Sequence, residues 1–441
     1  MDLFYKIISI LISLSIFGNA YVIKRIIGTW LFPGCLFSLF WFCYTFFPLV
    51  ILFEVPVNPL SMLYIFIATV VFSWSSIYFN WEQAFQTNKK KEPSSIVYDT
   101  RFLKKTLNYS VVLAIIFTVL QVNAQGIKIA DIFIHPLQTA GKYTSLKYTD
   151  KLNSSKFYIL SLLFSYISVL VGGLLFGSRI IKKEKRKTLI CFIPALAVMF
   201  SQGAKGLFFL SLFLFLGSLM ATNFNDGKIN LLNYKNNIRV LKFSIFSILI
   251  LSFSFFSRGL YNRDISYAFF KIRMYLTSYA FTHMYGFSDW FSAYIGNNAS
   301  QRYDVSNNYF GYYTLRAFTK YLPHNRPDIK GIYSEYFKYE DLIKSNIYTM
   351  YRGLIMDFSI IGSLIFIFIN GLILNVIFYS FLKAKKPIFS LAVMSFMIGY
   401  FYITYIISLL TWNITILSFI LFIFILTINK YKFVISKNDN I

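Results

Sequence analysis

The side chains best able to carry out chemistry lie in one long polar stretch, about residues 258 to 354 of the 441-residue chain. This stretch holds twelve Lys and Arg residues against seven Asp and Glu residues, a net charge of +5. Arginine binds phosphate oxygens through two parallel hydrogen bonds and keeps its charge at any relevant pH, whereas carboxylates repel phosphate. The excess of basic residues therefore suits an anionic, lipid-linked ligand.

Arg258 and Arg352, at the two ends of this stretch, and Arg263 are the strongest candidates for contacting such a ligand. They lie at predicted helix ends, where an ordered backbone would hold them at the depth of the lipid headgroups. A departing anionic group needs fixed cations, and removing one such donor typically costs about 100 to 1,000-fold in rate. The less specific interpretation is that each arginine contacts solvent or headgroups. By chemical type, the candidates for a base that activates a hydroxyl are Asp264, His283, His324 and Asp357.

No motif supplies a metal-binding cage, so we expect neither a metal nor another cofactor, with cations of the protein replacing a divalent ion. The cysteines, Cys35, Cys43 and Cys191, lie inside apolar segments without the spacing of a metal or redox site. Aromatic side chains of the polar stretch fit either sugar stacking or a belt at the membrane surface. They are Tyr279, Tyr285, Trp290 and Tyr294.

The composition indicates which elements position these residues. Hydrophobic residues make up 57% of the chain, aromatic residues 20% and charged residues only 14%, with a mean hydropathy of +0.58. Globular domains carry roughly 25% charged residues, so this composition is typical of a polytopic membrane protein and excludes an ordinary soluble enzyme. The net charge of +25 comes from short basic runs between apolar segments, which argues against nucleic-acid binding.

The apolar segments predict an all-α polytopic integral membrane protein with about eleven (ten to twelve) transmembrane helices and one long external loop. We expect about eight helices in residues 1–257, a large periplasmic loop at 258–354, about three helices in 355–429 and a cytoplasmic tail at 430–441. The expected spans are 5–22, 30–52, 60–80, 106–124, 157–177, 188–202, 206–222, 243–257, 355–382, 388–410 and 414–429.

The distribution of Lys and Arg predicts the orientation of these spans. One alternating set of connections holds 24 of them, whereas the opposite set holds 7 once the long loop is left out. Because positive loops stay in the cytoplasm, the long loop is expected outside. Within it, residues 267–287 suit an interfacial helix. Asp357 is the one carboxylate at the mouth of a span, and no internal repeat is apparent, which counts against an ion-coupled transporter.

The segment from Ser345, SNIYTMYRGLIMDFSIIGSLIFIFINGLI, resembles the entry to a late span of Wzy-type O-antigen polymerases. Members of this family commonly have a polar Asn-aromatic start, a basic residue, then Asp-Phe-Gly and a further Gly. Ser359 stands at the usual glycine of Asp-Phe-Gly, and Ser345 stands where related O-antigen ligases often have His. The matching positions are Asn346, Tyr348, Arg352, Asp357, Phe358 and Gly362. SQGAKGLFF at 201–209, with Lys205 in place of the more usual arginine, and SRGL at 257–260 are similar to further family segments.

This resemblance implies an inner-membrane glycosyltransferase of lipopolysaccharide biosynthesis that joins undecaprenyl-pyrophosphate-linked oligosaccharide units on the periplasmic side. Arg258, Arg352 and Lys205 would hold the pyrophosphate, with Asp264, His324 or Asp357 assisting the acceptor hydroxyl. The expected substrate-binding residues are Arg263, Arg273, Arg316, His283, Asn346 and Tyr348.

The expected partners are the lipid-linked oligosaccharides, membrane lipids, and a chain-length regulator and flippase of the same pathway, with no nucleic acid. The alternatives are an O-antigen-ligase-like glycosyltransferase, a polysaccharide flippase or transporter, and a non-catalytic membrane scaffold. A flippase would bind the same ligand without reaction, but it needs charges at mid-membrane depth, and the spans have almost none.

Overall fold

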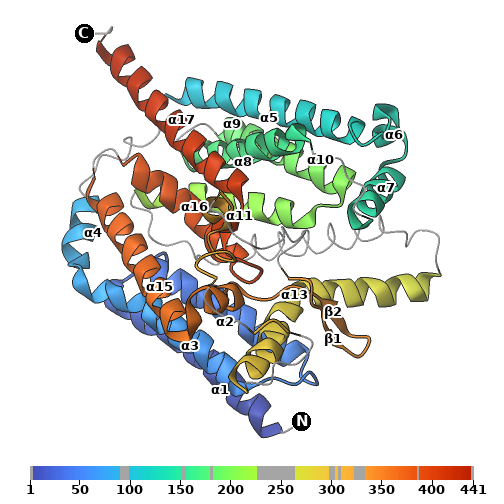
Figure 1. The fold of residues 1–441 in the computed structure, drawn as a ribbon. Helices are drawn as coiled ribbons and strands as arrows, with labels where there is room; N and C mark the ends of the chain where they lie inside the picture. Colours follow the sequence, from blue (N-terminus) through green and yellow to red (C-terminus); the bar gives the residue numbers. More distant parts are fainter. Residues whose placement is uncertain are drawn as a thin grey trace. The chain divides into compact units, whose positions relative to one another are not determined.

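The computed structural model describes residues 3–89, 99–149, 155–178, 182–225, 264–296, 303–305, 309–321, 333–384 and 387–438. Within these residues the chain is helical apart from one short β-hairpin, which confirms the predicted all-α class (Figure 1). The chain divides into two compact units. Unit 1 comprises Met1–Phe85, Arg273–Ser380 and Tyr400–Asn413, and unit 2 comprises Gln86–Ile272, Phe381–Gly399 and Ile414–Ile441.

Among the described residues, eight helices are long and apolar enough to cross a membrane, which takes roughly 20 apolar residues. These helices indicate a multi-pass membrane protein. They are α1 (Leu3–Ile27), α2 (Pro33–Ile51), α3 (Pro59–Trp74) with the 3-10 turn η1 (Ser75–Tyr78), α5 (Thr100–Asn123), α8 (Lys156–Gly177), α11 (Lys205–Asn225), α15 (Met350–Lys383) and α17 (Asn413–Asn438).

Eight of the eleven expected spans coincide with these helices, two differ, and one cannot be compared. Residues 188–202 form the 3-10 turn η2 (Thr188–Phe192) and the ten-residue α10 (Ile193–Gln202), which is too short to cross hydrocarbon as a helix. Residues 388–410 contain α16 (Phe389–Ile403), 15 residues long, and then the 3-10 turn η3 (Leu409–Thr411). The span expected at 243–257 lies outside the described residues.

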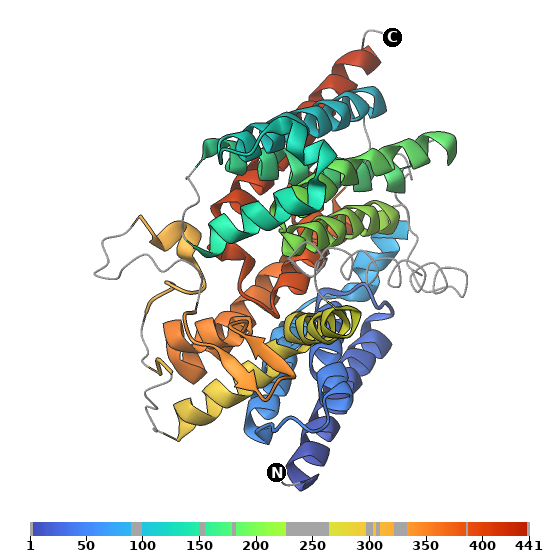
Figure 2. The same cartoon turned by 90° about the vertical axis from the view of Figure 1, so that its right-hand side faces the viewer.

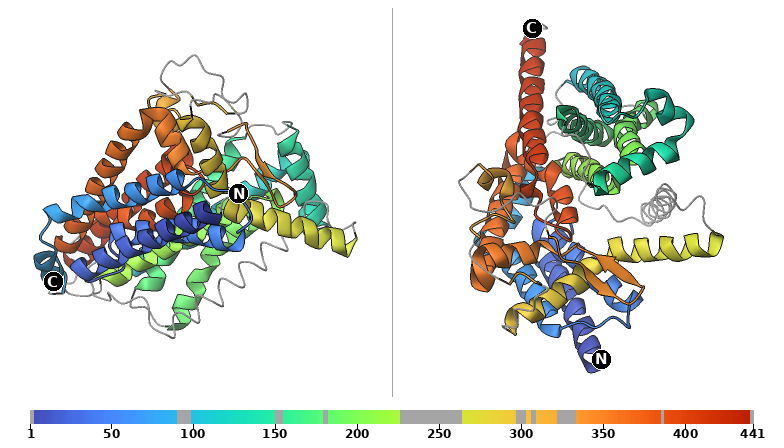
Figure 3. Two further views of the ribbon diagram at one scale, coloured as in Figure 1. Left: turned by 90° about the horizontal axis from the view of Figure 1, so that it is seen from below. Right: turned by 45° about the vertical axis from the view of Figure 1, so that its right-hand side comes forward.

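In unit 1, α1 packs along α2 and α3, and the three helices run side by side (Figure 3). Phe37 of α2 stacks on Phe72 of α3, with ring centroids 4.2 Å apart. Gly371 of α15 lies directly against α3, because a Cβ there would sit 2.1 Å from the Phe72 carbonyl oxygen. A side chain at position 371 would therefore force these two helices apart.

A buried lysine fastens the start of α1 to the rest of unit 1. Lys6 is fully buried, and its ammonium donates to the carbonyl oxygens of Leu52 (3.1 Å) and Val55 (2.9 Å) and to the Tyr285 hydroxyl (2.9 Å). Tyr285 in turn donates to the Leu52 carbonyl at 2.6 Å. All three ammonium protons thus have acceptors, as a buried charge requires.

Within unit 1, part of the polar stretch forms a layer on the other helices. We call this layer the cap, and it comprises the described residues from Arg273 to Thr349. It contains most of α13 (Ile265–Ile295), the short α14 (Arg316–Thr319) and strands β1 (Phe337–Tyr339) and β2 (Ile343–Ser345). The strands pair antiparallel, with Phe337 opposite Ser345. Thr277 and Ser278 of α13 bond to the backbone of this hairpin, which lies beside α13 (Figure 2). A helix over 267–287 is thus confirmed, and its interfacial position stays a prediction.

Unit 2 is built around α8, which packs against α5 and α11. Glycine lets α8 and α11 approach closely, since a Cβ at Gly173 would lie 2.4 Å from the Phe215 carbonyl oxygen. Asp99 caps α5 and exchanges two hydrogen bonds with Asn429 of α17. The shorter helices of this unit are α6 (Ile129–Ile134), α7 (Pro136–Tyr148), α9 (Lys182–Lys187), α10 and α16, and α4 (Trp81–Lys89) straddles the boundary between units.

Helix α15 is broken at Ser359, whose φ of 61° and ψ of 180° are not helical. Two carbonyl oxygens before the break, those of Met356 and Asp357, accept hydrogen bonds from Tyr309 N (3.2 Å) and Phe310 N (3.3 Å). The cap thus satisfies backbone groups that the broken helix leaves unpaired, which is the condition for irregular backbone inside a membrane protein.

We predict that Ser359→Gly stabilises the protein. A side chain in this backbone region costs about 1 to 3 kcal/mol, and the extra freedom of glycine in the unfolded chain returns about 0.4 to 1 kcal/mol. The expected net gain is therefore about 1 kcal/mol, measured as a higher midpoint of thermal unfolding in detergent. Ser359→Ala is the matched control, because it keeps the Cβ and should give no gain. Equal midpoints for the two variants would contradict the strain at this position.

Candidate functional site

The centre of the cap is a buried arginine surrounded by aromatic rings. Arg352, in the first turn of α15, has no exposed surface, and its Nη2 donates to Glu335 Oε1 at 2.9 Å. In the described part of the chain, Nε and Nη1 have no hydrogen-bond acceptor. The guanidinium carbon lies over four rings instead, at 4.1 Å from the centroid of Tyr333, 4.3 Å from Tyr348, 5.5 Å from Trp290 and 5.7 Å from Tyr303. Ring faces attract a cation, so this cage and Glu335 together replace water around the charge.

Two glycines make room for the cage. A Cβ at Gly353 would lie 3.1 Å from Tyr313 Cβ and 3.2 Å from the Tyr333 hydroxyl. A Cβ at Gly286 would lie 3.2 Å from two ring carbons of Tyr348. Any other residue at these positions would push a tyrosine away from the guanidinium.

Hydrogen bonds among cap segments hold the cage in place. Glu335 Oε1 also accepts from the backbone N–H of Asp304 at 3.2 Å, and the Trp290 indole donates to the Asp304 carbonyl at 2.9 Å. The Tyr348 hydroxyl donates to the Glu335 carbonyl at 3.2 Å. Burial raises the pKa of Tyr303 and of Tyr333, so both phenols stay protonated and neutral near pH 7.

Asp357 binds a second cap segment rather than a cation. Its carboxylate is buried and accepts from the backbone N–H of Tyr313 at 3.1 Å and of Thr314 at 2.7 Å. Gly311, with a φ of 87°, turns the chain into this loop. The loop that bonds to the broken backbone of α15 is therefore also held by the side chain of Asp357.

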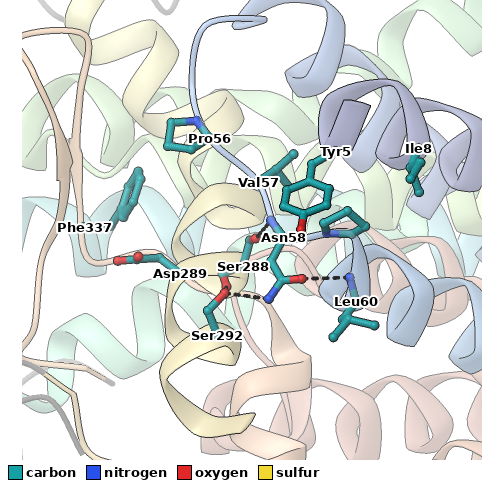
Figure 4. A pocket seen from close by; sticks show the side chains of 11 residues that line it. Tyr5, Ile8, Pro56, Val57, Asn58, Leu60, Ser288, Asp289, Ser292 and Phe337 are labelled. Atoms are coloured by element: carbon teal, nitrogen blue, oxygen red, sulfur yellow. Dashed lines mark hydrogen bonds between the residues drawn. The ribbon is translucent and has the colours of Figure 1, made fainter. Parts of the chain in front are cut away.

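A pocket of about 750 Å³ lies beside the cage within unit 1 (Figure 4). One wall is formed by Tyr5 and Ile8 of α1 and the other by Ser288, Asp289 and Ser292 of α13. The link 56–60 and Phe337 complete the lining. Among the described residues that line it, Asp289 is the one charged side chain, and its Oδ2 accepts from the Tyr303 hydroxyl at 2.7 Å.

Four of the sequence-predicted site residues gather around the cage. Arg352 and Tyr348 form it, Asn346 donates to the Tyr333 carbonyl at 3.0 Å, and Asp357 lies one and a half turns along α15 from Arg352. A pyrophosphate could contact the Arg352 guanidinium only after Glu335 or a ring had moved away. In the described part of the chain Arg352 thus contacts the cap, and its role in binding pyrophosphate stays a prediction.

The other expected site residues lie elsewhere. His283 is buried between the rings of Tyr44 and Tyr405, and its Nε2 lies 2.9 Å from the Tyr44 carbonyl oxygen. Lys205 begins α11 in unit 2 and is buried. Arg273 lies in α13, Arg316 lies over the Tyr312 ring at 5.3 Å, and exposed Asp264 precedes α13. Arg258, Arg263 and His324 lie outside the described residues.

Sequence reasoning assigned no role to Glu335 or Asp289. The signal for Glu335 was a carboxylate between aromatic residues in Tyr333–Tyr336, which is an unusual neighbourhood for an exposed loop. Asp289 carried no local signal, because the pocket it lines is formed by four segments far apart in the chain.

No protein-family model, curated protein or solved structure matches this chain. Its proposed function therefore depends on its residues and their geometry.

We predict that Arg352→Met lowers the free energy of unfolding by about 3 kcal/mol, because it leaves Glu335 partly buried without its cation. Arg352→Lys should lose about half as much, since lysine keeps the charge but not the planar contact with the rings. The matched control is Lys338→Met, which removes an exposed charge from the neighbouring hairpin. Thermal unfolding in detergent measures all three. Equal losses for Arg352→Met and Lys338→Met would show that the ion pair does not hold the cap.

We predict that the protein loses stability in mild acid because His283 is buried. Burial lowers its pKa from 6.5 to about 4, so between these values the unfolded chain binds a proton that the folded chain does not. The contribution of His283 to the free energy of unfolding is complete above pH 6.5. It falls as the pH drops and is about 2 kcal/mol smaller at pH 5. His283→Gln should therefore reduce the difference in unfolding midpoint between pH 7 and pH 5. Exposed His135→Gln is the control and should retain the wild-type difference.

Proposed function

We propose that this chain is a membrane glycosyltransferase that polymerises undecaprenyl-pyrophosphate-linked oligosaccharide units into O-antigen or a related surface polysaccharide. In this proposal it resides in the bacterial cytoplasmic membrane, and the cap faces the periplasm, as the distribution of Lys and Arg predicts. The growing glycan leaves its lipid carrier and is joined to a newly delivered unit. Fixed cations of the chain, without a metal, stabilise the departing pyrophosphate.

The observation that carries this proposal is the two-sided pocket beneath the cap. One wall belongs to α1, a span whose surrounding residues, such as Phe4 and Ile7, are exposed and apolar as a lipid-facing surface would be. The opposite wall presents hydroxyl, amide and carboxylate groups from Ser292, Asn58 and Asp289. A lipid-linked oligosaccharide matches this arrangement, because its sugars need the polar wall and its lipid needs an apolar surface beside the pocket.

The residues divide between positioning and charge stabilisation. Arg352, with Glu335 and the rings, positions the cap. Arg258 and Arg263, at the other end of the polar stretch, are the proposed ligands of the pyrophosphate. The resemblance of the Ser345 segment, which includes Arg352 and Asp357, to Wzy-type polymerases supports the same reaction.

Deletion of the gene followed by gel electrophoresis of the cell-surface polysaccharide tests the function. A polymerase predicts loss of the ladder while a single capped unit is retained, and the wild-type gene should restore the ladder. The Lys338→Met variant should restore it equally well, which controls for expression from the plasmid. Loss of all attached glycan would indicate a ligase instead, and accumulation of inward-facing lipid-linked units would indicate a flippase.

A further inference from the structure

The charge of the pocket lining favours the sugar of a lipid-linked substrate over its phosphate. It carries the Asp289 carboxylate, and among the described lining residues there is no basic side chain. A phosphate group next to Asp289 would be repelled, whereas sugar hydroxyls can donate to it. We propose, on the basis of the proposed polymerase function, that this pocket binds the acceptor glycan and that Asp289 is the base that activates its attacking hydroxyl.

The polar wall is rigid enough to orient a sugar. Asn58 donates through its backbone N–H to Ser288 Oγ and through its side chain to Ser292 Oγ, each at 2.8 Å. Its side-chain oxygen accepts from Leu60 N at 3.0 Å, so the amide is fixed at the start of α3 (Figure 4). The link before α3 and one face of α13 are thereby joined into one surface, and that surface presents the polar groups that line the pocket.

Aromatic groups border this polar wall. Tyr5 of α1 and Phe337 of β1 both line the pocket. The C–H faces of a pyranose ring pack on aromatic rings, while its hydroxyls project sideways to hydrogen-bonding groups. A volume of about 750 Å³ lies in the range of sites that enclose a small ligand. The terminal sugars of a glycan, rather than a lipid chain alone, match this combination.

Asp289 is oriented from behind by the cage. The Tyr303 hydroxyl donates to Asp289 Oδ2 at 2.7 Å, and the Tyr303 ring lies 5.7 Å from the Arg352 guanidinium. Because Tyr303 stays protonated, it acts as a permanent donor to this oxygen. The cage thus fixes the orientation of one carboxylate oxygen of this pocket-lining residue, and Tyr303 is a positioning residue.

The reaction step balances with these groups. The acceptor hydroxyl oxygen forms a bond to the anomeric carbon of the donor glycan while its proton passes to the Asp289 carboxylate. The bond between that carbon and the pyrophosphate oxygen breaks, and its electron pair leaves with undecaprenyl pyrophosphate. The departing pyrophosphate remains outside the pocket, because the described lining carries no basic side chain to hold it.

The test uses the purified full-length chain in detergent with lipid-linked repeat units, and it measures polymer formed per minute. Asp289→Asn should lower the rate at saturating acceptor by about 100-fold or more, the usual contribution of a general base, with little change in acceptor KM. Asp341→Asn is the matched control, because it removes an exposed carboxylate from the hairpin turn and should leave the rate unchanged. Equal unfolding midpoints establish that both variants are folded.

A second variant tests the pocket independently of the carboxylate. Ser292 is an exposed part of the lining, and Ser292→Trp fills the pocket without entering the core. It should raise the acceptor KM at least tenfold, and this result is expected even if Asp289→Asn fails to fold. If wild-type protein forms polymer while Asp289→Asn is fully active, or while Ser292→Trp has a wild-type KM, the acceptor site is wrong. If wild-type protein forms no polymer from authentic units, the proposed function itself fails.

Discussion

The fold of the cap depends on one buried charge. Arg352 has no exposed surface, and an arginine in such a place needs a counter-ion and a shell that replaces water. Glu335 supplies the first and four rings supply the second, and these five residues come from four separate parts of the polar stretch. Segments with little apolar core of their own are thereby drawn to one point at the start of α15.

The same helix holds the cap at a second point. Asp357 binds the loop at Tyr313 and Thr314, and the break at Ser359 leaves carbonyl groups that the adjoining residues of that loop satisfy. Two attachments about one and a half turns apart fix both the position and the rotation of the cap relative to α15. The orientation of Asp289, through Tyr303, follows from that placement.

The sequence was sufficient for the features that depend on local composition. Apolar length identified eight spans, because a helix in lipid satisfies its own backbone and needs no distant partner. It also singled out Arg352 and Asp357, for which substrate chemistry stays a prediction. It did not reveal their contacts with the cap, because partners such as Glu335 and Tyr313 are distant in the sequence and no periodicity identifies them. The apolar composition of residues 188–202 predicted a span that the structure does not contain. Pro194 lies at the start of a shorter helix there, and Gly203 ends it.

The buried lysine of α1 has a consequence for the order of assembly. Two acceptors of Lys6, Leu52 and Val55, are made soon after α1 itself, but the third, Tyr285, follows Lys6 by 279 residues. At synthesis rates of about 5 to 20 residues per second, roughly fifteen to sixty seconds pass between the synthesis of Lys6 and that of Tyr285. During this interval the Lys6 ammonium can reach the headgroups, as lysines near helix ends do. Helix α1 is therefore synthesised well before it reaches its final contacts, and the pocket to which it contributes a wall is completed only after α13 has been synthesised.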